Sequence, residues 1–166
     1  RGLRIAAASS EAEVRRATGD AFDALLVADG GLGFVLHARL VPVLATLATD
    51  SHDELTRAAA HAAATRLAAS EAGWEALRVC APDWFRDLWR ELRHDEPSTE
   101  LALSTLRALR AAVLESHLRT SALRQLRAVL SADDEMDDAA DELTAFELAL
   151  TDGLEALCGS PNSLVA

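Results

Sequence analysis

Residues 38–69 read ARLVPVLATLATDSHDELTRAAAHAAATRLAA, which is an apolar stretch, a polar turn and a second apolar stretch. In residues 40–47 the leucines and valines recur at the spacing of one helical face. The turn follows at residues 50–53, and Asp53 is of a residue type that caps helices by accepting a hydrogen bond from a first-turn N–H. Residues 54–69 repeat the helical spacing, so the stretch predicts two helices joined by a short turn.

The same alternation of helical patterns and polar turns continues on both sides of this stretch. Ala and Leu, both strong helix formers, supply 63 of the 166 residues. Tyr is absent and Ile occurs once, so the residue types that favour strands are scarce. We therefore predict an all-α chain. Besides a short apolar segment around Trp74, the expected helices cover about residues 11–29, 37–47, 54–69, 84–92, 100–115, 118–130 and 135–157. Ser10 is the expected cap of the first.

Parts of the chain resemble one another at a fixed distance. Residues 12–17 (AEVRRA) are similar to residues 53–58 (DELTRA), 41 positions further along. Residues 99–101 (TEL) align with the start of the same segment at a displacement of 46. Each of these segments opens a predicted helix after a polar turn. A period of about 40 to 47 residues is typical of helical solenoids, in which each repeat buries its apolar face against its neighbours.

The run LVPVLATL at residues 40–47, Asp50 in the turn and ELTRAA at residues 54–59 together resemble a HEAT repeat. The resemblance implies a right-handed α-solenoid of HEAT/armadillo-like helix pairs. Residues 30–32 and the segment around Trp74 are similar to the armadillo variant, whose repeats add a short third helix, and the choice between the two stays open. Residues 1–166 then form one helical-repeat domain. Its expected units are 11–35 (second helix of a partial repeat), the repeats 36–72, 73–116 and 117–158, and 159–166 (start of a further repeat or a tail).

The resemblance also implies a function, because such proteins bind partner proteins along a groove lined by the second helix of each pair. We therefore expect a non-catalytic scaffold or adaptor that uses no cofactor and binds another protein. The positions that match the groove are Arg16, Asp20, Arg57, His61, Leu103 and Arg107.

The densest run of charge is acidic and includes Asp133, Asp134, Asp137 and Asp138. It lacks the central Gly and the final Glu of a calcium-binding loop. One interpretation is a solvated turn and helix N-terminus, where carboxylates favour the helix dipole. The functional interpretation is an acidic docking patch for a basic segment of the partner.

Two further classes of function remain open. The first is a co-chaperone or assembly factor of the same architecture, such as an Hsp70 nucleotide-exchange factor. The second is a helical enzyme or ligand-binding bundle whose site is assembled from distant residues. A buried polar pocket that joins His and acidic residues from several helices would favour the second. An unbroken apolar seam between helix pairs would favour the scaffold. A third alternative is a compact bundle without repeats, in which helices far apart along the chain would pack against each other.

Composition excludes several other classes. The formal net charge of −11, with no Lys, makes nucleic acid a poor partner, because an acidic surface repels phosphates. No run approaches the ~20 apolar residues that span a bilayer. Cys80 and Cys158 lie far apart, which suits reduced thiols, and we expect a cytoplasmic protein. Since the chain does not begin with Met, we expect it to be part of something longer.

The spacing of the remaining motifs indicates structural roles and not binding or catalytic ones. Residues 30–33 (GGLG) follow a helical pattern and lack the Lys and Ser/Thr of a phosphate-binding loop, so they predict a helix stop in a left-handed conformation. The five histidines show no metal-binding spacing. Trp74, Trp84 and Trp89 lie within 16 residues, and we expect them mainly in the core.

Overall fold

The computed structural model describes residues 1–50, 52–93 and 97–130, and every regular element among them is a helix, which confirms the all-α prediction for this part of the chain. The helices are α1 (Gly2–Ala7), α2 (Ala12–Val27), α3 (Gly31–His37), α4 (Val41–Ala48), α5 (Glu54–Ala68), α6 (Glu71–Cys80), α7 (Trp84–Arg93), α8 (Thr99–Leu114) and α9 (Ser116–Leu130). The predicted helix over residues 135–157 lies outside the described residues.

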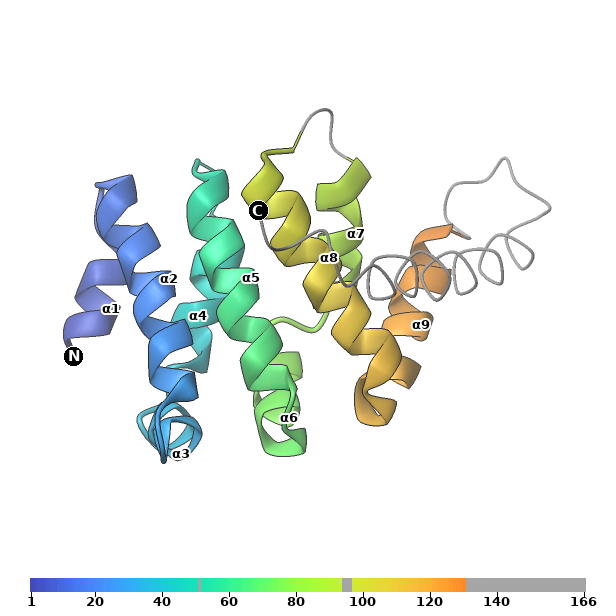
Figure 1. Cartoon of the computed structure of the whole chain (residues 1–166), viewed down its shortest axis with the longest axis horizontal. Helices are drawn as coiled ribbons and strands as arrows, with labels where there is room; N and C mark the ends of the chain where they lie inside the picture. Colours follow the sequence, from blue (N-terminus) through green and yellow to red (C-terminus); the bar gives the residue numbers. More distant parts are fainter. Residues whose placement is uncertain (51, 94–96, 131–166) are drawn as a thin grey trace, which may run out of the picture.

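Helices α2, α5 and α8 lie side by side in one layer (Figure 1). The second layer packs behind them, with α1 against α2, α4 and α6 against α5, and α7 against α8. Among the described helices, each packs mainly against helices that lie at most three positions away along the chain.

One predicted helix is divided in two. The apolar pattern from His37 to Leu47 predicted a single helix, but α3 ends at His37 and α4 begins at Val41. Arg39 between them adopts a positive φ of 52°, which ends α3 and turns the chain. The short segment predicted around Trp74 is a helix of 10 residues, α6. Three helices therefore lie from the end of α2 to the end of α5, namely α3, α4 and α5, and three from the end of α5 to the end of α8, namely α6, α7 and α8.

The corners that lead into these units recur. At the α2–α3 corner, a Cβ added to Gly31 would lie 1.7 Å from the carbonyl oxygen of Leu25. At the α5–α6 corner, a Cβ added to Gly73 would lie 1.9 Å from the carbonyl oxygen of Leu67. Both residues of the second corner lie 42 positions after those of the first. The same close approach of backbone to backbone, possible only for Gly, thus occurs twice, 42 residues apart.

Helix ends agree with the sequence in most places. The Asp53 carboxylate accepts a hydrogen bond from the N–H of Thr56 at 3.0 Å, which confirms the predicted cap of α5. Gly30 adopts the predicted left-handed conformation, with φ of 74°, but α3 begins directly after it. The predicted Ser10 cap is wrong, because α2 begins after Glu11 and it is the hydroxyl of Ser9 that accepts a hydrogen bond from the Glu11 N–H.

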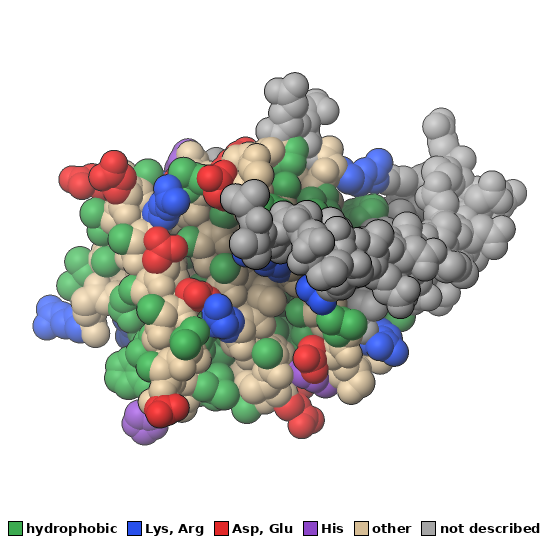
Figure 2. All heavy atoms as spheres, viewed as in Figure 1, with side chains coloured by type: hydrophobic (Ala, Val, Ile, Leu, Met, Phe, Trp, Pro, Cys, Tyr) green, Lys and Arg blue, Asp and Glu red, His purple; other side chains and the backbone are tan. Residues whose placement is uncertain are grey.

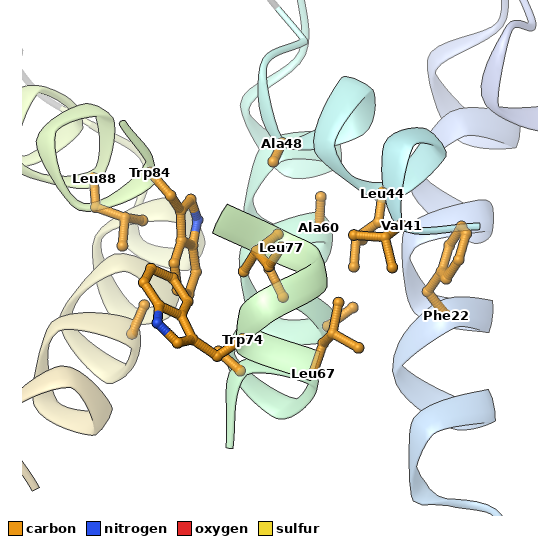
Figure 3. Close-up of a cluster of buried hydrophobic side chains, with 14 of the residues drawn as sticks. Phe22, Val41, Leu44, Ala48, Ala60, Leu67, Trp74, Leu77, Trp84 and Leu88 are labelled. Atoms are coloured by element: carbon orange, nitrogen blue, oxygen red, sulfur yellow. The ribbon is translucent and has the colours of Figure 1, made fainter. Parts of the chain in front are cut away.

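The core is an apolar seam between the two layers (Figure 3). It extends from Phe22 on α2 to Leu88 on α7, and both side chains are fully buried. Trp74, Trp84 and Phe85 form an aromatic cluster at the α6–α7 corner, with ring centroids 5.1 to 6.5 Å apart. Trp74 and Trp84 are 3% and 2% exposed, which confirms that these two tryptophans lie in the core.

No single helix among the described residues is long and apolar enough to cross a membrane. By length and composition alone, α3 and α4 pass that test as a pair, but they meet at an angle of 93°. Both helices also contribute buried side chains to the seam, such as Val35 and Leu44.

Candidate protein-binding face

The outer sides of α2, α5 and α8, which lie side by side (Figure 1), form a surface that we call the front face, and Figure 2 shows its α2 side. Because α4 and α6 pack behind α5, one stripe of its half-buried and exposed residues follows the helical spacing on the outer side: Leu55, Ala59, Ala62 and Arg66. Two of these four are alanines, so the middle helix is a low ridge. The neighbouring helices carry longer side chains, and the exposed ones include Arg16 and Asp20 on α2 and Leu103, Leu106, Arg107 and Arg110 on α8.

Four of the six predicted groove residues lie exposed on the two outer helices of this face. Arg16 and Asp20 are accessible on α2, and Leu103 and Arg107 are accessible on α8. Leu103 is 48% exposed, and Leu106, which the sequence comparison did not select, is 42% exposed. Within the described residues, Arg16 and Arg107 form no ion pair, so their guanidinium groups are accessible to a partner.

His61 does not belong to the surface. Its side chain is 1% exposed, and its Nδ1 accepts a hydrogen bond from the indole N–H of Trp84 at 3.3 Å. Burial, with a smaller contribution from the charge of Arg57, lowers the pKa of His61 to about 3. The ring is therefore a neutral part of the α5–α7 packing, and the prediction that it lines a groove is corrected.

Arg57 is also engaged inside the protein. One of its terminal nitrogens donates to the backbone oxygen of Asp50 at 2.7 Å, and its Nε lies 2.8 Å from a carboxylate oxygen of Glu91 on α7. Its side chain is only 15% exposed. It therefore ties the α4–α5 turn to α7 and is not a free cation for a partner, unlike Arg16 and Arg107.

A chain of polar contacts extends this link across successive helices. Arg15 at the start of α2 pairs with the Asp50 carboxylate at 2.5 Å. Burial by itself raises the pKa of Asp50, but hydrogen bonds from the His52 N–H and from Arg15 outweigh it and hold that pKa below its ordinary value. On the other side, Glu54 accepts a hydrogen bond from the N–H of Ser98, the cap residue of α8, at 2.9 Å.

A cleft of about 380 Å³ opens beside this network, between the end of α4 and α7. Its charged lining is mostly paired internally: Arg57 holds Glu91, and Arg15 holds Asp50. Desolvation raises the pKa of Asp87, although Arg86 and Arg90, at 3.8 and 3.7 Å, oppose this. Within residues 1–50, 52–93 and 97–130, no group of three His, Cys, Asp or Glu side chains is placed to hold a metal ion. The cleft is best explained as part of the contact between helices.

The network predicts the consequence of removing its central cation. Replacing Arg57 with Met keeps the length of the side chain but leaves the Glu91 carboxylate and the Asp50 carbonyl without their partner. We expect the free energy of unfolding to fall by about 2 kcal/mol. Urea unfolding followed by tryptophan fluorescence measures this. Arg78→Gln, in the exposed Glu75–Arg78 pair on α6, is the control and should leave the midpoint unchanged. Equal midpoints for Arg57→Met and wild type would contradict the structural role of Arg57.

The acidic residues Asp133, Asp134, Asp137 and Asp138, which were predicted as a docking patch, lie outside the described residues. The sequence also missed Arg15 and Leu106. Arg15 and Arg16 are adjacent in the sequence, and only the position of Asp50 in the folded chain shows that Arg15 is paired and Arg16 is exposed.

No protein-family model matches this chain, and neither a curated protein nor a solved structure does.

Proposed function

We propose that the chain is part of a right-handed α-solenoid of the HEAT/armadillo kind that binds another protein through its front face. The observation that carries the proposal is the recurrence of one corner, Gly31 against Leu25 and Gly73 against Leu67, at 42 residues within helices that pack mainly against near neighbours along the chain. Three helices for each described unit favour the armadillo variant within this class.

The chemistry of the front face supports a protein partner. A low ridge of alanines on α5 lies between helices that present Arg16 and, on α8, Leu103 and Arg107. Arginine and exposed apolar side chains beside a shallow surface are typical of anchor positions in protein interfaces. The seam between the layers is apolar from Phe22 to Leu88, which favours the scaffold over an enzyme assembled from distant residues.

The proposal predicts that a partner is lost when the α8 end of the front face is changed. The full chain is used as bait in a lysate of its source organism, alongside a Leu103→Asp/Arg107→Gln variant. Loss of one apolar anchor and one arginine is expected to weaken a captured partner at least about tenfold. The affinity is then measured with the purified partner.

The matched control is Val79→Asp/Arg78→Gln on α6, which also changes one exposed apolar residue and one exposed arginine. A partner that binds wild type and control but not the α8 variant supports the proposal. Equal binding by all three chains would remove the front face from the interface. A folded chain that captures no partner would argue for another function.

A further inference from the structure

Charge is unevenly divided along the chain. Residues 1–130 hold all 16 arginines and 17 of the 27 acidic residues, a net charge of −1. Residues 131–166 hold the other 10 acidic residues and no basic residue. Nearly all of the net charge of −11 therefore belongs to the C-terminal 36 residues.

The last described helices have the opposite character. Four arginines of α8 and α9 are exposed, Arg107, Arg110, Arg119 and Arg124, against two acidic residues, Glu100 and Glu115. On α8, Arg107 and Arg110 lie at helical spacing beside Leu103 and Leu106, which are 48% and 42% exposed. This surface is both basic and apolar.

The sequence after α9 has the complementary chemistry. Seven acidic residues within 133–142 are followed by Leu143, Phe146, Leu150 and Leu154, which recur at the spacing of one helical face. The tether is short, because α9 turns back from the end of α8 and packs against it, and position 133 follows Leu130 by three residues (Figure 1). A segment tethered so closely has an effective concentration in the millimolar range.

We propose that residues 133–154 dock within the same chain on the α8 part of the front face, with acidic side chains toward Arg107 and Arg110 and apolar side chains toward Leu103 and Leu106. This occupant has the right charge and the right apolar pattern and is covalently attached beside the surface. It follows that a partner using the α8 end of the front face must displace the segment. That consequence rests on the proposed function, whereas the docking itself does not.

Digestion of the purified full chain tests the docking without any partner. A protease that cleaves after glutamate has four sites in residues 133–155, at Glu135, Glu142, Glu147 and Glu155. Reversing two charges, Arg107→Glu with Arg110→Glu, should speed cleavage at these sites about tenfold at low ionic strength, because attraction is replaced by repulsion. The control Arg1→Glu with Arg39→Glu makes the same change in net charge at exposed positions away from α8 and should leave the rate unchanged.

Circular dichroism melting must show that both variants remain folded. Equal cleavage rates for wild type, α8 variant and control would overturn the proposal, as would equal acceleration by both variants.

A photo-cross-linking residue at position 103 gives a second readout. Cross-links to residues 133–154 of the same chain support the docking. Cross-links only between two chains, or to no part of the segment, would overturn it. Loss of partner capture in the preceding experiment would change none of these results, so failure of one proposal is distinguishable from failure of the other.

Discussion

Replacing Gly31 with alanine should destabilise the protein by about 3 kcal/mol, whereas the same change at Gly33, two positions along the same helix, should not. A Cβ at Gly31 would lie 1.7 Å from the carbonyl oxygen of Leu25, far closer than two non-bonded heavy atoms can approach. The carbonyl belongs to the backbone near the end of α2, so the clash between the added Cβ and this oxygen is removed only if α3 moves away from α2. A Cβ at Gly33 meets nothing within 4 Å.

Gly33 is therefore the matched control. It lies exposed inside α3, where alanine is the better helix former, so Gly33→Ala should be neutral or stabilising by up to about 1 kcal/mol. Gly73→Ala repeats the test one unit later and should resemble Gly31→Ala, since its Cβ would lie 1.9 Å from the Leu67 carbonyl oxygen.

Thermal unfolding followed by circular dichroism measures all three variants. The Gly31→Ala and Gly73→Ala chains should melt about 10 °C below wild type. If Gly31→Ala and Gly33→Ala melted together, the α2–α3 corner would not be as close as the structure has it. If Gly31 were sensitive and Gly73 were not, the two corners would not be equivalent, and the proposed repeat of 42 residues would lose its main support.

The sequence predicted those parts of the fold that depend on local chemistry. Asp53 caps α5 because a carboxylate one residue before the helix can reach the N–H of Thr56. Gly30 adopts the positive φ that its residue type allows, in the turn between α2 and α3. The break between α3 and α4 was not predictable in this way, since it depends on a positive φ at Arg39, a residue type that rarely adopts one.

The candidate site was predictable where exposure follows helical spacing. Arg16 and Arg107 are accessible because they lie on the outer stripes of α2 and α8. His61 was misplaced because alignment at 46 residues equates it with Arg107. Trp84 of α7 covers this position of α5. Burial at a position therefore depends on the next unit of the chain, which a comparison of short segments does not include.

The buried His61 makes the stability of the protein depend on pH. In the unfolded chain an imidazole has a pKa of about 6.5. Burial lowers the pKa of His61 to about 3 in the folded chain. The unfolded state therefore takes up a proton below pH 6.5 that the folded state cannot accept, and stability falls as the pH falls from about 6.5 toward 3. Above pH 6.5 the ring is neutral in both states and has no effect.

Between pH 7 and pH 5 this difference should remove about 2 kcal/mol of the free energy of unfolding. Urea unfolding of the wild type at both pH values, followed by tryptophan fluorescence, gives the total change. The reference is His61→Asn, whose side-chain oxygen can still accept the hydrogen bond from the Trp84 indole N–H but does not titrate. This variant should be less stable at pH 7, because a smaller side chain leaves a cavity, yet should lose about 2 kcal/mol less than wild type on going to pH 5. All other titrating groups are common to both chains, so the difference isolates His61. If wild type and His61→Asn lost the same free energy of unfolding between pH 7 and pH 5, His61 would take up its proton in the folded chain as readily as in the unfolded chain, and its imidazole would not be buried away from water.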